Sequence, residues 1–350
     1  MNEYITIGGR KVGPQFPPYI IAELSANHNG DIKRAMQILE MAKHSGADAI
    51  KIQTYTQDTL TINCDKPEFK IKGGLWNGRT LYDLYTEAHM PWEWHKPLFE
   101  KANELGITIF SSPFDYTAVD MLEELGAPAY KIASFEAIDL PLIEYVAKTG
   151  KPMIISTGMA NEKEIREAVD AAKNAGCKEL VVLHCVSGYP APAEDYNLST
   201  IPDMAKRFAV LTGLSDHTID NTTAITSVAL GACLIEKHVT LDRKGGGPDD
   251  SFSLEEPELT QLCRDSKTAW QALGKVNYQR KKSEEGNMVF RRSLYAVKDI
   301  EEGEYFTTEN VRSIRPGYGL APKYLNDVIG KRSKIAIKKG TPLSLELTKK

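Results

Sequence analysis

The sequence has 350 residues, of which 42% are hydrophobic and 26% are charged. This composition excludes a disordered or collagen-like chain, and the length predicts about two domains or one large barrel with a small companion. The net charge of −4 excludes a generally basic nucleic-acid footprint, so an anionic substrate would have to be held by locally placed lysine and arginine side chains.

A repeating unit runs from Pro18 to Gly274. Each unit has a short apolar run, a polar turn and an amphipathic stretch that ends near a glycine. The apolar runs predict eight strands, at residues 19–24, 48–55, 107–114, 127–135, 151–159, 179–186, 208–217 and 232–239. Apolar residues three and four apart predict intervening helices, such as residues 31–46, 116–126, 139–150, 161–176 and 221–231, with Asp or Asn to cap their starts. This alternation favours a closed (β/α)8 TIM barrel over an open doubly wound sheet.

Two stretches depart from the repeat. Residues 56–91 predict a loop inserted over the barrel mouth, because loops of this length are usually functional lids or disordered. After Gly274 the repeat stops and a polar, charged stretch follows. We therefore divide the chain into a barrel (1–275), a linker (276–290) and a small domain of short strands and turns (291–350). A unit of about 60 residues is near the lower limit for independent stability, so packing against another body would help it.

The sequence carries few signs of the protein's cellular location. No run of about 18 apolar residues is present, and the first residues lack the charged-then-apolar pattern of a signal peptide. Five scattered cysteines with no CxxC pair predict reduced thiols. We expect a cytoplasmic protein with no membrane and no nucleic-acid partner.

Polar side chains occur at nearly all the predicted strand ends, where the active site of a (β/α)8 barrel lies. Buried polar groups need partners or a ligand, so this recurrence is a stronger signal than any single motif. The candidates include Glu23, Lys51, Gln53, Ser112, Lys131, Ser134, Ser156, Ser187, Tyr189, Ser215, His217 and His238.

Two pairs among these candidates suggest chemistry. His217 and His238 end neighbouring strands and could bind a divalent cation with Glu23 or Asp249 nearby; the alternative is two hydrogen-bonded core histidines. Lys51 and Lys131 either clamp a phosphate or carboxylate, or one of them forms a Schiff base with a carbonyl substrate, and the adjacent hydroxyls favour the anion cradle. The glycines at 245–247 lack the strand–GxGxxG–helix context of a dinucleotide site and favour a flexible loop.

Nine motifs resemble, in order, those of the sialic acid synthase family: IAELSANHNGD, KIQTY, SSPFD, YKIAS, ISTGMA, LHCVSGYPAP, GLSDHT, EKHVTLD and GPDDSFSLE. The region from RRSLYAVKDIEEGE through IRPGYGL to KIAIKKGTPL resembles that family's C-terminal antifreeze-like (SAF) domain. SANHNGD and GPDDSFSLE are most similar to the pseudaminic acid branch. The resemblance implies an α/β chain with a (β/α)8 barrel followed by a β-rich SAF domain.

The activity that the resemblance implies is a metal-dependent condensation of phosphoenolpyruvate with 2,4-diacetamido-2,4,6-trideoxy-L-altrose, giving pseudaminic acid and phosphate. The alternative is an N-acetylneuraminate or legionaminate synthase that uses N-acetylmannosamine or a related sugar. In either case the protein would be a carbon–carbon bond-forming transferase.

The resemblance also implies a set of roles. Mn2+ or Mg2+ would bind His217 and His238, and Glu23 would be the acid/base catalyst. The phosphoenolpyruvate site would comprise Lys51, Ser112, Lys131, Ser134, Ser156, Ser187 and Ser215. Candidates for binding the sugar are the polar side chains Gln53, Glu136, Tyr189 and Asp249, with structural hydrogen bonding as the alternative for Glu136 and Tyr189. The resemblance adds Arg315 to the sugar site. Arg315 would act in the partner's barrel of a domain-swapped homodimer.

Three rival interpretations are weaker. A Schiff-base aldolase would use Lys51 or Lys131 covalently and would tolerate chelators. An ice- or glycan-binding module would need a flat, weakly charged face, whereas the C-terminal domain carries many charges. An inert scaffold would gain nothing from polar groups at the strand ends.

Overall fold

The computed structural model describes residues 3–349 and divides into two compact units between Gly274 and Lys275. The first unit is a closed barrel of eight parallel strands, which confirms the predicted fold class. The strands are β3 (Tyr19–Glu23), β4 (Ala49–Thr54), β5 (Thr108–Pro113), β6 (Tyr130–Ile132), β7 (Met153–Ser156), β8 (Leu180–Cys185), β9 (Leu211–Asp216) and β10 (Leu234–His238). Neighbours pair in chain order, and β10 closes the barrel on β3 with His238 opposite Glu23.

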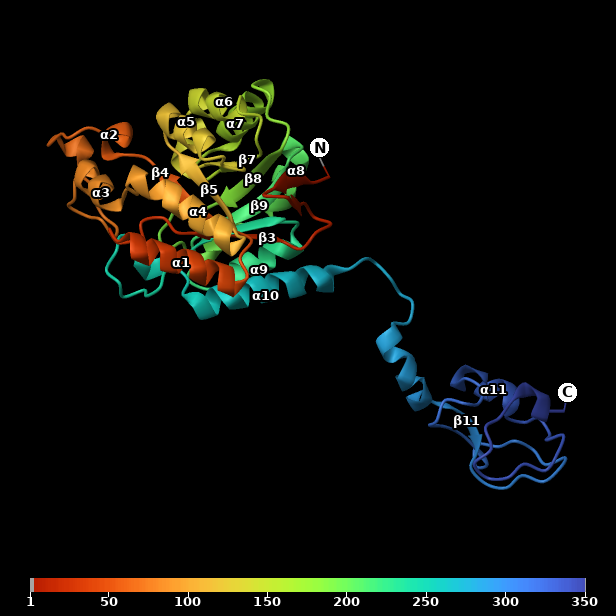
Figure 1. Cartoon of the computed structure of the whole chain (residues 1–350). Helices are drawn as coiled ribbons and strands as arrows, with labels where there is room; N and C mark the ends of the chain where they lie inside the picture. The colour runs from red at the N-terminus through yellow and green to blue at the C-terminus, as the bar shows by residue number, and fades with distance from the viewer. Residues whose placement is uncertain (1–2, 350) are drawn as a thin grey trace. The chain divides into compact units, whose positions relative to one another are not determined.

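Helices cover the outside of this barrel (Figure 1). They are α1 (Ile32–Ser45), α4 (His95–Leu105), α5 (Tyr116–Glu124), α6 (Leu140–Ala147), α7 (Glu162–Asn174), α8 (Thr200–Phe208), α9 (Thr222–Ala229) and α10 (Glu256–Leu273). Helix α1 shows how the sequence sets their limits. The Asp31 side chain accepts a hydrogen bond from the Lys33 amide at the start, and Gly46 adopts the left-handed conformation at the end, with φ of 89°.

Side-chain alternation along each strand places the functional groups. On β3, Ile20 and Ala22 belong to the core under the helices, whereas Tyr19 and Ile21 belong to a separate core inside the barrel. The next inward residue is Glu23, so each strand contributes apolar residues to the barrel's interior first and a polar residue at its C-terminal end. The apolar layer therefore supports a polar layer above it.

An N-terminal hairpin completes the apolar layer. Strands β1 (Ile5–Ile7) and β2 (Arg10–Val12) pair antiparallel, and Ile5, Ile7 and Val12 are fully buried in the same core as Tyr19. This hairpin was not predicted from the sequence. It covers the end of the barrel opposite the polar strand ends.

The inserted segment after β4 is ordered into short pieces. These are α2 (Gln57–Leu60), the 3-10 turn η1 (Pro67–Phe69), α3 (Leu81–Ala88) and the 3-10 turn η2 (Trp92–Trp94). Trp76 in this segment donates its Nε1–H to the Pro248 carbonyl at 3.2 Å, which ties the segment to the loop after β10. We call residues 56–91 the lid segment.

Further 3-10 turns follow three of the barrel strands: η3 (Ser134–Ile138), η4 (Ala193–Asp195) and η5 (Asp250–Phe252). The second unit contains η6 (Lys282–Phe290), β11 (Ser293–Ala296), β12 (Val311–Ile314), η7 (Pro322–Tyr324), α11 (Leu325–Val328) and η8 (Leu345–Leu347). Strands β11 and β12 pair antiparallel over a small core that includes Leu294, Phe306 and Leu343. No helix formed by residues 3–349 is both long and apolar enough to cross a bilayer.

Candidate active site

The polar strand ends meet in a cavity of about 410 Å³ at the C-terminal mouth of the barrel. The cavity brings together most of the predicted site residues: Glu23, Lys51, Gln53, Lys131, Ser134, Glu136, Ser156, Tyr189, Ser215, His217, His238 and Asp249. Ser112 lies beneath it, where its fully buried hydroxyl accepts a hydrogen bond from Lys51 at 3.2 Å. Arg315 belongs to the second unit, in the loop after β12, and its contact with sugar stays a prediction.

Two buried lysines and two buried carboxylates form the floor of the cavity. Lys51 Nζ is 2.5 Å from Glu23 Oε2 and 3.7 Å from Glu236 Oε1. Lys131 Nζ is 3.3 Å from the same Glu236 oxygen, which also accepts from Ser215 Oγ at 3.3 Å. The lysines and glutamates are at most 4% exposed, so each charge depends on its partners rather than on water.

The two carboxylates titrate differently. Burial raises the pKa of Glu23 above its ordinary value; Lys51 opposes this shift, and the negative charge of Glu236 adds to it. Burial would also raise the pKa of Glu236, but Lys131 and Lys51 outweigh burial and lower it. Separated pKa values of this kind let one carboxyl carry a proton while the other stays charged.

Ser134 and Ser156 line the cavity together with Lys131, whereas the predicted site residue Ser187 is not one of its lining residues. The Ser156 and Ser187 hydroxyls have no hydrogen-bond partner, and Ser134 donates to the Cys185 sulfur at 3.3 Å. Gly158 permits this convergence, because a β-carbon there would lie 2.5 Å from Ser187 Oγ and 2.6 Å from Ser134 Oγ. An unpartnered hydroxyl in the same cavity as a buried ammonium group suits the oxygens of a phosphate or carboxylate.

The two predicted metal ligands face the same part of the cavity. The ring centroids of His217 and His238 are 5.4 Å apart. His217 Nδ1 donates to the Val186 carbonyl at 2.8 Å, which leaves its Nε2 lone pair available. His238 Nδ1 is buried without a hydrogen-bond partner and lies 4.0 Å from Asp249 Oδ2. Burial lowers the pKa of His238 well below its ordinary value, so this imidazole is neutral.

These donors fit a divalent cation. Neutral imidazole is a common ligand, and the unpartnered His238 nitrogen has no other explanation among its described contacts. Among residues 3–349, no group of three His, Cys, Asp or Glu side chains is arranged to hold a metal alone. A cation here would therefore take further ligands from water or substrate.

The side of the cavity beyond the histidines mixes polar and apolar groups. Gln53 Nε2 donates to Glu23 Oε1 at 3.3 Å and to Ser25 Oγ at 3.2 Å, and Ser25 donates to Asp249 Oδ2 at 2.5 Å. Tyr189 lies over His217 with ring centroids 4.3 Å apart. Apolar residues of the lid segment complete the wall: Leu60, Ile71, Trp76, Leu81, Leu84 and Tyr85.

Glu136 is separate from these groups, on η3 at the edge of the cavity. Burial raises its pKa to about 7, and its Oε2 has no hydrogen-bond partner. A carboxyl in this state can donate or accept a hydrogen bond near neutral pH.

Sequence reasoning overlooked three contributors to the cavity. Glu236 was not among the predicted site residues, yet it joins both lysines. Ser25 connects Gln53 to Asp249, and Trp76 attaches the lid segment to Pro248. Inward alternation along β10 could have identified Glu236, because Leu234, Glu236 and His238 share one face. The contacts of Ser25 and Trp76 depend on loop geometry, for which the sequence has no periodic signal.

Comparison with known proteins places this cavity in a wider context. The NeuB family matches residues 38–278, and the SAF domain matches residues 291–346. The chain is 46% identical over 325 residues to "Pseudaminic acid synthase" of Campylobacter jejuni subsp. jejuni serotype O:2, covering 93% of this chain and 95% of that protein. It is 42% identical over 331 residues to "Pseudaminic acid synthase" of Helicobacter pylori, covering 94% and 97%.

Two further comparisons extend beyond the pseudaminic acid synthases. "N,N'-diacetyllegionaminic acid synthase" of the same Campylobacter jejuni serotype is 37% identical over 316 residues, covering 89% of this chain and 94% of that protein. Among solved structures, the N-acetylneuraminic acid (sialic acid) synthetase of Leptospira borgpetersenii serovar Hardjo-bovis in complex with citrate matches with a TM-score of 0.72 and 32% identity. That match covers 81% of this chain and 95% of the other.

Proposed function

Because the chain belongs to the NeuB family, we propose that it is a pseudaminic acid synthase, a transferase that condenses phosphoenolpyruvate with 2,4-diacetamido-2,4,6-trideoxy-L-altrose. The family assignment confirms the resemblance on which the sequence analysis relied. The observation that carries the proposal is the convergence of an anion cradle, two imidazoles and an apolar wall in one cavity.

Phosphoenolpyruvate fits the buried end of the cavity. Its phosphate and carboxylate groups need several positive charges and hydroxyl donors, which Lys51, Lys131 and the unpartnered Ser156 supply in the cavity, with Ser187 close to Ser134. A protein with net charge −4 holds such an anion only through local groups. Lys51 and Lys131 are therefore assigned to anion binding rather than to a Schiff base.

The proposed reaction forms one carbon–carbon bond and breaks one carbon–oxygen bond. C3 of the enol forms a bond to the aldehyde carbon of the open-chain sugar, and the aldehyde oxygen takes up a proton. Water adds at C2 and loses one proton. The C2–O bond to phosphate then breaks while the C2 hydroxyl gives its remaining proton to the departing phosphate, which leaves the 2-keto acid and inorganic phosphate. Glu23 is placed to move these protons, because it lies beside Lys51 and Gln53 in the cavity and its pKa is raised.

The proposed cofactor is Mn2+ or Mg2+, held by the imidazoles of His217 and His238. When bound, the cation supplies Lewis-acid chemistry that polarises the aldehyde group. Tyr189 packs over His217 and restricts its ring, while the hydrogen bond to Val186 fixes the His217 tautomer.

The apolar lid wall supports the choice of sugar. The proposed substrate carries two acetamido methyl groups and a terminal methyl group where N-acetylmannosamine has a hydroxyl. Trp76, Leu81 and Tyr85 offer apolar surface to such groups, whereas Gln53 and Asp249 can bind hydroxyls. The alternative, a legionaminate or N-acetylneuraminate synthase, has weaker support because the legionaminic acid relative is 37% identical against 46% for the pseudaminic acid relative.

We further propose that the protein works as a cytoplasmic homodimer in which the second unit of one chain delivers Arg315 to the sugar in the partner's barrel. The support is the family resemblance of the IRPGYGL segment and the small core of the second unit.

Phosphate release from phosphoenolpyruvate tests the function. Chelator-treated protein is assayed with and without Mn2+ against the diacetamido-trideoxy-altrose, N-acetylmannosamine and its 6-phosphate. We expect metal-dependent release with the first sugar alone. Release with N-acetylmannosamine instead would keep the mechanism and overturn the choice of sugar. No release with any sugar from folded, metal-supplemented protein would overturn the reaction class.

A further inference from the structure

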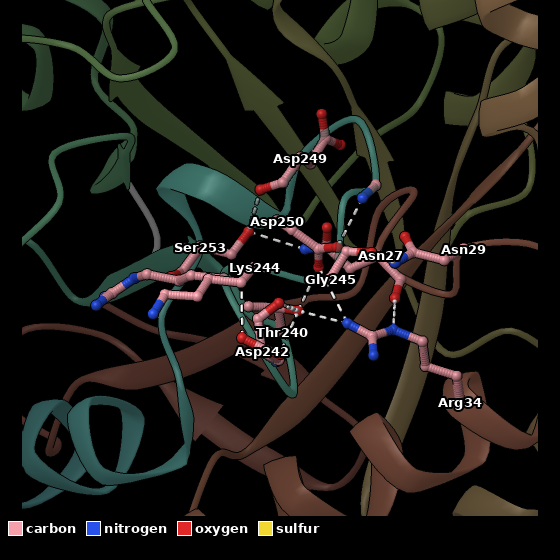
Figure 2. Close-up of polar contacts among 12 residues, drawn as sticks. Asn27, Asn29, Arg34, Thr240, Asp242, Lys244, Gly245, Asp249, Asp250 and Ser253 are labelled. Carbon is pink, nitrogen blue, oxygen red and sulfur yellow. Dashed lines mark hydrogen bonds and ion pairs between the residues drawn. The ribbon is translucent and has the colours of Figure 1, made fainter.

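Asp249 and Asp250 are consecutive, yet their side chains point in different directions (Figure 2). The Asp249 carboxylate lines the cavity and accepts from Ser25 Oγ at 2.5 Å. The Asp250 side chain does not line the cavity. It is 1% exposed and lies between the loop that follows β3 and the loop that follows β10. One aspartate therefore faces the substrate cavity, and the other faces the protein.

The Asp250 carboxylate has four partners. Its Oδ1 is 3.2 Å from Arg34 Nη2 and also accepts from Thr240 Oγ1. Its Oδ2 accepts from Asn29 Nδ2 at 2.8 Å and from the Gly247 amide at 2.9 Å. A buried charge is stable only when it is paired and hydrogen-bonded, so this carboxylate holds together the segments that supply its partners.

Arg34 extends the network from the first turn of α1. Its Nε donates to the Asn27 carbonyl at 2.7 Å, and its Nη2 donates to Thr240 Oγ1 at 3.0 Å. The Asn27 side chain donates to Ser253 Oγ at 2.8 Å, and Ser253 in turn donates to the Asp249 carbonyl at 2.7 Å. A continuous set of hydrogen bonds thus connects Arg34 to the backbone of Asp249.

The local backbone is shaped around this network. A β-carbon on Gly245 would lie 2.5 Å from Asp250 Oδ2 and 2.8 Å from Arg34 Nη2, and one on Gly247 would overlap the Asn29 side chain. The glycine run was expected to form a flexible loop; the structure instead shows two of its glycines packed closely against charged and amide groups.

Two non-glycine residues in the loop after β3 adopt left-handed backbone conformations, Ser25 with φ of 49° and Asn29 with φ of 47°. Each donates its side chain to one of the two aspartates: Ser25 to Asp249 and Asn29 to Asp250. Residues in strained regions persist only where surrounding contacts hold them. The loop after β3 is therefore held by the same groups that fix the loop after β10.

From these contacts we propose that Arg34 and Asp250 are positioning residues for the sugar subsite. They hold residues 245–253 so that Asp249 stays against Ser25 and the Pro248 carbonyl stays within reach of Trp76 in the lid segment. The inference rests on the proposed function, because it assumes that Asp249 contacts the sugar. Neither positioning residue touches the lysines of the anion cradle, so phosphoenolpyruvate binding is independent of them.

Steady-state kinetics of Asp250→Asn and Arg34→Gln test the proposal. We expect KM for the sugar to rise about 10- to 100-fold, because charge-assisted hydrogen bonds that hold the loop are lost, while KM for phosphoenolpyruvate changes less than about twofold. Asp242→Asn is the matched control. It removes the same charge from the same loop, but the Asp242 carboxylate accepts only the local Lys244 amide at 2.8 Å among the described contacts. This control should behave like the wild type.

A double variant separates positioning from independent defects. Arg34 and Asp250 contact each other, so the double variant should lose less sugar affinity than the two single losses added together. If Asp250→Asn fails to fold, Arg34→Lys keeps the charge while losing the forked geometry, and it should show the same selective rise in sugar KM. An unchanged sugar KM in folded variants, or an equal loss for both substrates, would overturn the proposal.

A further readout keeps the two proposals apart. If the wild type turns over no amino sugar, the proposed function fails. Amide hydrogen exchange then shows whether Asp250 holds residues 245–253 in place. Exchange in residues 245–253 should then be faster in Asp250→Asn than in Asp242→Asn. Equal exchange in the two variants would overturn the positioning role.

Discussion

Lys237 and Asp216 face each other directly across the β9–β10 pair, with Lys237 Nζ 2.9 Å from Asp216 Oδ2 and both side chains buried. They lie on the faces of the strands that point away from the cavity. The residues on either side therefore point inward, which places His217 and His238 together at the mouth. Lys237 also donates to the Thr218 and Asp220 carbonyls at 2.7 Å each, so it fixes the loop that carries His217.

Replacement of Lys237 by Met is expected to lower the free energy of unfolding by about 3–5 kcal/mol, because it leaves the Asp216 charge buried without its partner. Denaturant unfolding followed by circular dichroism measures this loss. Lys163→Ala is the control: its ion pair with Glu167 is largely exposed, and its loss should cost less than about 1 kcal/mol. A loss below about 1 kcal/mol in Lys237→Met would show that the buried pair does not stabilise the barrel.

Glu136 predicts a pH dependence of stability. Burial raises its pKa from 4.5 to about 7 in the folded protein. Below pH 4.5 the group is protonated in both states. As the pH rises from 4.5 to 7, the unfolded chain releases the proton while the folded protein keeps it, so up to about 3 kcal/mol of stability is lost by pH 8.

Glu136→Gln should remove this dependence. The measurement compares the unfolding free energy of the wild type and the variant at pH 5 and pH 8. The difference between the two proteins should change in favour of the variant at the higher pH. A difference that is the same at both pH values would contradict a raised pKa at Glu136.

The sequence predicted the barrel well because inward-facing and outward-facing side chains alternate along its strands. Tyr19, Ile21 and Glu23 repeat every second residue, and the periodicity that identifies the strand also determines which side chain reaches the cavity. The N-terminal hairpin carried its own signal, since Gly8 and Gly9 separate two short strands in the manner of a tight turn, but that signal was overlooked.

Other features could not be derived from local pattern. Glu236 joins Lys51 and Lys131, which lie on strands far away in the sequence, and only closure of the barrel brings the three together. The opposite directions of Asp249 and Asp250 likewise follow from the partners that Ser25 and Asn29 provide, not from any periodicity of the loop.

Gly158→Ala tests the phosphoenolpyruvate cradle. The added methyl group would collide with Ser134 and Ser187, so we expect KM for phosphoenolpyruvate to rise about tenfold or more through weakened charge-assisted hydrogen bonds, with the sugar KM little changed. Gly176→Ala is the control, because Gly176 also has a positive φ, 109°, but has open space around it. An equal effect of both substitutions on phosphoenolpyruvate binding would attribute the loss to backbone strain.

Arg315→Ala tests whether Arg315 contacts the sugar. Loss of the guanidinium group should raise KM for the sugar about 10- to 100-fold while the barrel stays folded, because a charge-assisted hydrogen bond contributes about 1.5–3 kcal/mol. Arg312→Ala, an exposed arginine on β12 of the same unit, should leave the sugar KM unchanged. An unchanged sugar KM in Arg315→Ala would remove Arg315 from the sugar site.

Mixing two impaired variants, at a sugar concentration too low for Arg315→Ala alone to turn over appreciably, shows which chain supplies Arg315. In a hybrid dimer of Arg315→Ala with Glu23→Gln, the chain with an intact Glu23 receives an intact Arg315 from its partner only if the second units are exchanged. Random re-association of equal amounts makes about half of the dimers hybrids with one intact site each, so about a quarter of wild-type activity should return. Mixtures that stay inactive, although mass analysis shows that hybrids form, would mean that each chain supplies its own Arg315.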